Sequence, residues 1–376
     1  MIGFIIRRLI GIIPTLFFSS LLIYSILLAA PGGPEVRFAQ NPKVTTAQIA
    51  AFRARWGLDQ PIPIQYCRWI GVCNTMTGAK QLGDDPVGGL AKLFISEQGL
   101  PNFLPSGLGG GDNGALHGDF GYSSTNGQPV ASVISGRIAA TAILGGVALV
   151  VWILLALVSG VVAAVNRYGK ADTIITIFNY VGFSFPTFWL GLMLILLFAG
   201  NLNWLPSGGM WDVREVPIFG TDEYTQLLRE RPVFVLMDLA RHLVLPVVTL
   251  VFVNIAGDSR FVRAAMIDAL GQDYVRTARA KGVAERRVIV GHALRNALLP
   301  VVTNVALELP LLFTGAIVTE TIFSWPGMGR AYIEAVSEYD YTVLMGILVI
   351  TALIVVLANL LADIVYAIVD PRISYG

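Results

Sequence analysis

The sequence predicts an all-α membrane protein with six transmembrane helices, and both its composition and its hydropathy pattern indicate this class. The chain has 376 residues, of which 55% are hydrophobic and only 14% are charged, whereas soluble domains carry about 25% charged residues. Its mean hydropathy is +0.68. A helix needs about 20 mainly apolar residues to cross a bilayer. Six stretches reach or approach that length: Leu9–Ala30, Ile138–Val165, Thr173–Phe198, His242–Ala256, Leu298–Val318 and Val343–Val369.

The first of these stretches has to be distinguished from a signal peptide, because Arg7 and Arg8 precede it and two alanines end it. A signal peptide has an apolar region of about 7–15 residues, and the run from Leu9 to Ala30 is longer than this. We therefore expect a retained transmembrane helix. The fourth stretch, His242–Ala256, is short, but it can extend as a continuous helix into the residues that follow.

The spans divide the chain into an N-terminal transmembrane helix (residues 1–30), a polar segment rich in glycine and proline (31–137) and a five-helix core (138–376). Within the polar segment, residues 71–116 are typical of an insertion, because their glycine-rich texture differs from that of their surroundings. The core contains the most cationic segment of the chain, residues 258–300, between two hydrophobic blocks.

Lysine and arginine are distributed as expected for cytoplasmic N- and C-termini, since short cytoplasmic loops carry an excess of these residues. In this orientation the cytoplasmic side holds eight basic residues between Arg260 and Arg295, whereas the opposite loop, Glu320–Tyr341, holds only Arg330. Residues 31–137 then form an extracytoplasmic loop or subdomain. Because the basic residues are separated by membrane side and do not form one patch, we expect no nucleic-acid partner.

The chain has two cysteines, Cys67 and Cys73, and both lie in the extracytoplasmic segment. Oxidising compartments permit disulfides, so a bond that closes a small loop is one expectation and a pair of free thiols is the alternative. Two cysteines without further Cys or His residues nearby are too few for a zinc site. We therefore expect no metal.

Residues Asp273–Gly282 have the pattern of a short capped helix in the middle of the cationic segment. Asp273 is a residue type favoured at the N-cap, and Gly282 can take the left-handed conformation that ends a helix. Arg279 and Lys281 stand in the last turn, where the helix dipole favours cations. A cationic helix outside the membrane that is capped at both ends indicates that another protein binds it.

The sequence offers this chain no energy source of its own. It contains no G-x-x-x-x-G-K-[ST] loop to hold ATP, and a proton relay would need a series of buried ionisable groups, whereas only Glu308 lies near the middle of a span. Glu308 either lines a substrate path and meets a cationic group, or is protonated and bonded to a neighbouring helix. Asn254 and Asn304 are further candidates for the path. The spans contain neither H-E-x-x-H nor paired aspartates, so an intramembrane enzyme is not supported, while a self-sufficient secondary transporter is the rival hypothesis.

Residues Gln272–Gly282, followed by His292–Asn296 and Leu299–Pro300, resemble the EAA loop of importer-type ABC permeases, and more narrowly that of the first permease subunit of the dipeptide, oligopeptide and nickel group. The resemblance covers nearly the whole chain except about 71–116, and its other parts are Gly57–Pro61, Gln65–Tyr66, Gly118–Ser123, Pro129–Val130, Arg137, Thr141, Glu320–Gly329 and Asp370–Ile373.

The chain departs from the general EAA pattern in several places. Arg276 occupies the acidic position, and the distance from Gly282 to Pro300 is about five residues longer than in the broad superfamily; both features are similar to the peptide-permease subgroup. Pro31–Pro34 lacks the acidic residue usual after the first span. The insertion is the largest departure. It either contacts an external substrate-binding protein or covers the pore mouth, or it is a tolerated surface loop, since long insertions in loops cost little.

The resemblance implies a type I ABC importer permease in the cytoplasmic (inner) membrane of a bacterium or archaeon, which translocates di- or oligopeptides; nickel or another small solute is the alternative. It implies a heterodimer with a homologous permease, two cytosolic ATPase subunits and an external substrate-binding protein. The chain itself would be no enzyme and bind no cofactor, while ATP and Mg²⁺ would bind to the ATPases. The expected ATPase-coupling helix comprises Asp273, Tyr274, Arg276, Thr277, Ala278, Arg279, Ala280, Lys281 and Gly282; the alanines would leave room for close approach, and Arg279 and Lys281 would meet carboxylates on the ATPase.

Overall fold

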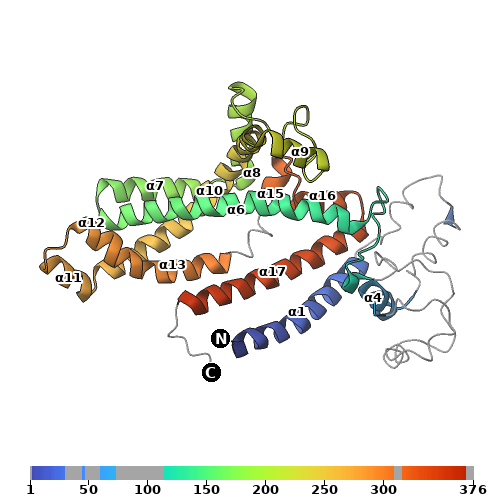
Figure 1. Cartoon of the computed structure of the whole chain (residues 1–376), viewed down its shortest axis with the longest axis horizontal. Helices are drawn as coiled ribbons and strands as arrows, with labels where there is room; N and C mark the ends of the chain where they lie inside the picture. Colours follow the sequence, from blue (N-terminus) through green and yellow to red (C-terminus); the bar gives the residue numbers. More distant parts are fainter. Residues whose placement is uncertain (1, 30–44, 47–59, 73–113, 309–315, 370–376) are drawn as a thin grey trace. The chain divides into compact units, whose positions relative to one another are not determined.

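The computed structural model describes residues 2–29, 45–46, 60–72, 114–308 and 316–369. Within these ranges the regular structure is helical (Figure 1), apart from one isolated β-bridge between Tyr122 and Pro129. Five of the described helices are long and apolar enough to cross a membrane, and a bent pair gives a sixth if it is counted as one span. The predicted all-α membrane class is therefore confirmed.

The described ranges contain the following helices. In chain order they are α1 (Ile2–Ala29), α4 (Ile62–Ile70), the 3₁₀ turn η1 (Ala115–His117), α6 (Val130–Val165), α7 (Lys170–Ser184), α8 (Thr187–Leu194), the π-helical η2 (Ile195–Asn201), α9 (Asp222–Glu230), α10 (Pro232–Leu270), α11 (Asp273–Ala280), α12 (Glu285–Arg287), the π-helical η3 (Val288–Leu294), α13 (Arg295–Glu308), α15 (Ile317–Ile322), α16 (Met328–Ser337) and α17 (Tyr341–Val369).

The third predicted span, Thr173–Phe198, is not one straight helix. The chain bends by 98° between α7 and the pair α8–η2. The bend lies at Phe185–Pro186, where Phe185 has an extended backbone with φ −84° and ψ 129°. A residue before proline is disfavoured in the helical region, and proline itself has no N–H to donate. The expectation of a continuous span overlooked this dipeptide.

The fourth predicted span is much longer in the structure than the stretch His242–Ala256. Helix α10 has 39 residues and continues without a break from Pro232 to Leu270. The expected extension into the polar segment is thus confirmed. At the usual rise of 1.5 Å per residue, such a helix is about 58 Å long, so it extends well beyond a bilayer core of about 30 Å.

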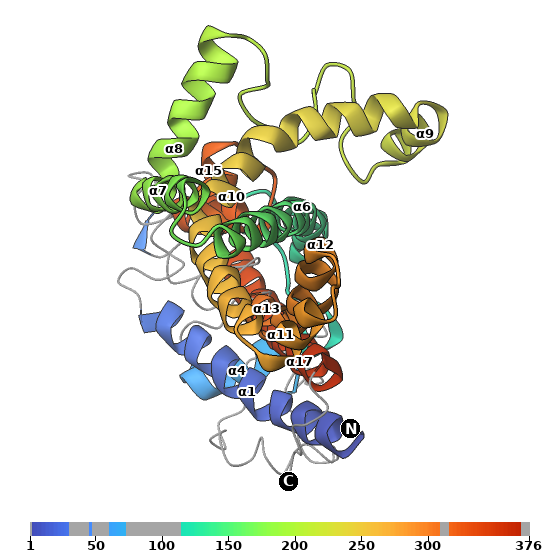
Figure 2. The ribbon, with the colours of Figure 1, turned by 90° about the vertical axis from the view of Figure 1, so that its left-hand side faces the viewer.

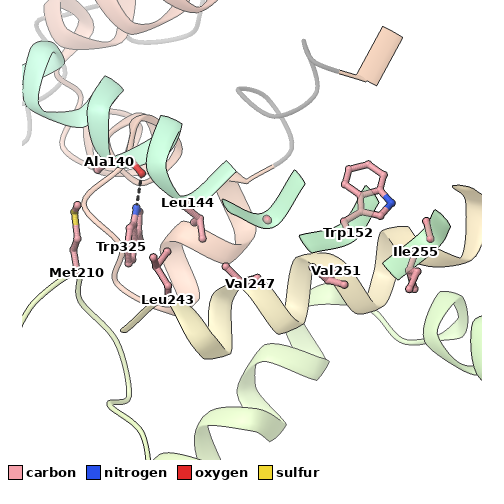
Figure 3. Close-up of a cluster of buried hydrophobic side chains, with 11 residues drawn as sticks. Ala140, Leu144, Trp152, Met210, Leu243, Val247, Val251, Ile255 and Trp325 are labelled. Carbon is pink, nitrogen blue, oxygen red and sulfur yellow. Dashed lines mark hydrogen bonds between the residues drawn. The ribbon is translucent and has the colours of Figure 1, made fainter. Parts of the chain in front are cut away.

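The chain divides into two compact units, of which the first comprises residues 1–9, 139–330 and 354–376. Its main apolar core joins α6 to α10 (Figure 3): Leu144 and Ala148 of α6 lie in one cluster with Leu243, Val247 and Val251 of α10. These α10 residues recur at the spacing of one helix turn, which places them on a single face.

Small residues bring the helices of the first unit into close contact. A Cβ atom at Gly160 of α6 would lie 2.6 Å from Val262 Cβ of α10, and one at Gly182 of α7 would lie 2.7 Å from the carbonyl oxygen of Phe252. Small residues at such crossings let membrane helices approach backbone to backbone. As a result, α10 packs against both α6 and α7 (Figures 1 and 2).

The second unit comprises residues 10–138 and 331–353. An aromatic cluster attaches α1 to α4: Tyr24, Tyr66 and Trp69 have ring centroids 5.5–6.0 Å apart, and Ser20 Oγ lies 2.7 Å from the Tyr66 hydroxyl. At the start of α17, the Asp340 carboxylate accepts a hydrogen bond from the Ser123 hydroxyl. Most of the proposed insertion 71–116 lies outside the described residues, as do other parts of the segment 31–137 and all of residues 309–315. The boundaries 1–30, 31–137 and 138–376 therefore stay predictions.

Candidate functional site

The N-terminus of α11 differs from the expected one. The helix begins at Asp273, and its N-cap is Gln272, which has an extended backbone with φ −75° and ψ 152° and makes no side-chain capping bond. The prediction that Asp273 is the N-cap was therefore wrong by one residue. Asp273 lies in the first turn, where its charge still complements the helix dipole, and its carboxylate pairs with the Arg276 guanidinium at 3.4 Å.

The C-terminus of α11 is formed as predicted. Gly282 has φ +74°, its N–H donates to Arg279 O at 2.9 Å, and the N–H of Val283 donates to Ala278 O at 3.2 Å. These two bonds, around a left-handed residue, make up the Schellman motif, which satisfies carbonyls that a helix end otherwise leaves open. The prediction of a left-handed glycine at this position is confirmed.

The two faces of α11 have different environments. Val275 is fully buried and Ala278 is 8% exposed, and both pack in an apolar cluster with Met266 of α10 and Val288 of η3. The expectation that Ala278 leaves room for a partner was therefore wrong, because Ala278 faces its own chain. The exposed face comprises Tyr274, Arg276, Thr277, Arg279 and Ala280 of the helix, together with Lys281 and Gly282, which directly follow it.

Arg279 is already engaged within the chain. Its Nη2 atom donates to Glu285 Oε1 at 2.6 Å and its Nε atom donates to Glu285 Oε2 at 3.2 Å. This carboxylate raises the pKa of Arg279 above its ordinary value. The ion pair between Arg279 and Glu285 connects α11 to α12 across the turn at Gly282, so it helps to fix the conformation of this turn. Lys281 and Arg276 belong to the exposed face.

Helix α11 forms the tip of a hairpin whose two arms are α10 and α13. Its buried face is continuous with Val262 of α10 and with Ala297 and Val301 of α13, in one apolar cluster. Figure 1 shows α11 at the end of both arms, with α12 beside it. A force on α11 would therefore be carried into two membrane-spanning helices through packed side chains.

The three candidates for a translocation path do not all come together. Asn304 and Glu308 meet on α13, where Asn304 Nδ2 donates to Glu308 Oε1 at 3.3 Å. Asn254 on α10 is exposed, and its amide donates to its own helix at Leu250 O, 2.7 Å away. The structure instead brings Asp258 to the pair: it is 7% exposed and accepts from Asn304 Nδ2 at 2.8 Å. We predicted Asp258 only as the start of a cytosolic segment.

The motif Glu320–Gly329 is a buried polar junction between α6, α15 and α16. Glu320 is fully buried and accepts from the Thr141 hydroxyl at 2.7 Å and from the N–H groups of Gly329 and Arg330 at 2.7 and 3.1 Å. A Cβ at Gly327 would overlap the Glu320 carboxylate, so this position has to be glycine.

Trp325 completes this junction. It is fully buried, and its indole N–H donates to Ala140 O at 2.8 Å (Figure 3). The spacing of glutamate, tryptophan and two glycines in the sequence thus serves to fasten α15 and α16 to α6. Within the described residues, both carboxylate oxygens of Glu320 accept hydrogen bonds. The motif therefore has a structural role at this junction.

A partly buried ion pair connects α7 to α10. Arg263 Nε and Nη2 donate to the two carboxylate oxygens of Asp172, each at 2.7 Å, and Asp172 also accepts from the N–H of Tyr168 at 2.9 Å. Asp172 is 5% exposed. Such a two-pronged contact between arginine and carboxylate fixes geometry as well as charge.

The cysteines are only partly described. Cys67 lies in α4 and takes part in a disulfide. Cys73 lies outside the described residues, so the pairing of Cys67 with Cys73 stays a prediction.

Comparison with known proteins covers the chain almost completely. Residues 156–375 match the family described as "Binding-protein-dependent transport system inner membrane component", and residues 1–101 match its N-terminal companion family. The chain is 36% identical over 376 residues to the oligopeptide transport system permease protein AppB of Bacillus subtilis, covering all of both chains.

Two further relatives agree with this result. The chain is 33% identical over 376 residues to a putative peptide permease protein of Brucella ovis, covering 100% of this chain and 99% of the relative. It is 32% identical over 375 residues to the glutathione transport system permease protein GsiC of Escherichia coli, covering all of both chains. The chain therefore belongs to the family of binding-protein-dependent transport system inner membrane components, the membrane permease subunits of ABC importers.

Proposed function

We propose that this permease subunit translocates di- or oligopeptides that an external substrate-binding protein delivers. The observation that carries the proposal is the match over the full length of the chain to an oligopeptide permease and a glutathione permease, since glutathione is itself a small peptide. Nickel or another small solute remains the alternative substrate. Uptake by the assembled complex of di-, tri- and longer peptides and of Ni²⁺, each with and without the binding protein, discriminates between them.

In this proposal the chain pairs with a homologous permease subunit, and two cytosolic ATPases, which hold ATP and Mg²⁺, bind the exposed face of α11. The chain has no catalytic role of its own. Its N- and C-termini are cytoplasmic, which places α11, Arg167 and Lys170 on the ATPase side. The support for α11 as the docking element is its geometry: a short helix, fixed at its C-terminus by Gly282, with one buried face and one free face.

Docking of the ATPase at the exposed face of α11 can be tested by introducing a negative charge at Ala280. Ala280 is exposed on α11, so Ala280→Asp leaves the core of the chain intact but places a bulky anion against the ATPase. We expect normal membrane insertion, with peptide uptake and peptide-stimulated ATP hydrolysis both reduced at least tenfold. Ala131→Asp, at an exposed alanine of α6, is the matched control and keeps both activities. Wild-type uptake by Ala280→Asp would refute docking at this face.

A further inference from the structure

The polar cluster between α10 and α13 contains more acceptors than donors. Asp258 Oδ2 and Glu308 Oε2 are both buried, and neither meets a donor within the described part of the chain. The two carboxyl groups interact directly with each other. An ionised carboxylate can only accept hydrogen bonds, so two ionised groups would leave both oxygens without a partner and repel each other.

We propose that Asp258 and Glu308 hold a single proton between them, and that this proton closes a clamp between the two arms of the α11 hairpin. One shared proton turns the pair into a carboxylic acid that donates to a carboxylate. It satisfies both orphan oxygens at once and removes one of the two negative charges. The Asn304 amide, which donates to Asp258 Oδ1 and Glu308 Oε1 at 2.8 and 3.3 Å, holds the remaining oxygens of the same pair.

A third helix, α6, contributes to this site. Trp152 of α6 is 9% exposed, and its indole N–H makes no hydrogen bond within the described residues, yet it lies against the Asp258 carboxyl. An indole N–H can only donate, so it favours the oxygen that retains negative charge. An otherwise unused indole N–H thus lies beside the one charge that remains after the proton is bound.

The two arginines that follow Asp258 on α10 do not neutralise the pair. Arg260 is two residues further along α10, but its Nε atom donates to Ala256 O at 2.9 Å and its guanidinium lies over the ring of Tyr180. Both donor atoms of Arg263 that face α7, Nε and Nη2, bind the Asp172 carboxylate. A bound metal cation is disfavoured because Asn304 presents its amide hydrogens to both carboxyl groups, and hydrogen-bond donors repel a cation. A proton is the ligand that this arrangement fits.

The clamp lies where it can stiffen the hairpin that carries α11. Asp258 is 13 residues from Gly271, where α10 leads into α11, or about 20 Å along the helix. The apolar cluster between α10, α11 and α13 already joins the arms near α11, and the clamp joins them again further from α11. If α11 is the docking site of the ATPase, as proposed above, loss of the proton would loosen the arms and reduce the fraction of the ATPase motion that reaches the spans.

Infrared spectroscopy of the reconstituted transporter tests the proton directly, without relying on ATPase docking. Near neutral pH, the difference spectrum between wild type and Asp258→Asn should contain the C=O band of one carboxylic acid that shifts in D₂O. Glu308→Gln should remove the same band, because in either variant the new amide donates to the remaining carboxylate. Glu223→Gln, at an exposed carboxylate of α9, is the control and should leave the band in place.

Two results would overturn the shared proton: a carboxylic acid band that neither variant loses, or a band that only one variant loses, because the proton then belongs to a single residue. If one variant fails to insert, the other decides. A pH series of peptide-stimulated ATP hydrolysis then tests the consequence. Wild type should lose stimulation as pH rises and the proton leaves, whereas Asp258→Asn, whose amide needs no proton, should have a flat profile. A flat wild-type profile with the band present would refute the coupling role alone.

Discussion

Replacement of Gly282 by alanine isolates the backbone requirement at the end of α11. Gly282 has φ +74°, and a Cβ atom there would meet no atom within 4 Å. Packing therefore does not oppose the substitution, and its cost comes from the left-handed conformation alone, about 1–2 kcal/mol for a residue with a Cβ. Because 1.4 kcal/mol corresponds to a factor of ten, the correctly closed helix end should be populated about 5- to 30-fold less relative to an unwound one.

The functional loss should follow from the two hydrogen bonds that this end makes. Without the bonds from Gly282 to Arg279 O and from Val283 to Ala278 O, α11 loses its fixed direction relative to α12. We expect Gly282→Ala to assemble with its partners, since Val275 and Ala278 still hold the buried face. Peptide-stimulated ATP hydrolysis and uptake in proteoliposomes should fall several-fold, with little change in the thermal stability of the transmembrane core.

Two comparisons make this result specific. Gly282→Asn should recover much of the activity, because asparagine enters the left-handed region more readily than other non-glycine residues. Gly136→Ala, at an exposed glycine of α6 whose Cβ would also meet nothing within 4 Å, should be neutral or slightly stabilising because alanine is the better helix former. Wild-type coupling in Gly282→Ala would refute the role assigned to this turn.

Further predictions concern the junctions and the orientation of the chain. Arg263→Ala leaves the carboxylate of Asp172 with only the N–H of Tyr168 as a donor, which should destabilise the permease by about 1–3 kcal/mol, while Arg263→Lys should cost less. Thermal unfolding in detergent measures both, and equal stability of all three proteins would contradict the ion pair. Glu320→Gln removes the negative charge that strengthens the hydrogen bonds from the N–H groups of Gly329 and Arg330, which are worth about 1.5–3 kcal/mol each. Gly327→Ala, whose methyl group overlaps Glu320, should lower the unfolding temperature further than Glu320→Gln does. A smaller loss for Gly327→Ala would show that a side chain fits at Gly327. A cysteine at exposed Arg286 should react with an impermeant maleimide only in inside-out vesicles and one at exposed Arg214 only in right-side-out spheroplasts, and the opposite pattern would invert the topology.

Much of the helical architecture could be predicted, because apolar length is a strong signal in a membrane protein. The break in the third span could not be placed by hydropathy, which treats Phe185 and Pro186 as apolar like their neighbours, although the backbone chemistry of the dipeptide was visible in the sequence. The N-cap of α11 was displaced by one residue, because aspartate is favoured both at the N-cap and in the first turn.

The burial of individual side chains was harder to predict than the helices that carry them. Ala278 reads as a small residue on a cationic helix, and only the fold shows that it packs with Met266 and Val288. Asp258 reads as the polar start of a cytosolic loop, and only the pairing of α10 with α13 places it next to Asn304. In each case the partner is distant in sequence, so local patterns contain no information about the contact.

The cationic segment would be explained most simply if its arginines only oriented the chain in the membrane, since the excess of basic residues in cytoplasmic loops requires no more than that. That explanation accounts for charge, but it places no demand on geometry. It does not explain the left-handed backbone of Gly282 or a helix in which Val275 is buried while Tyr274 and Arg276 are exposed. Nor does it explain why Arg279 pairs with Glu285 of the same chain. A segment that served only as an anchor would tolerate an unstructured loop at this position. The structure builds a rigid turn there and attaches it to two membrane helices, which is what a surface needs if a partner is to move those helices by binding to it.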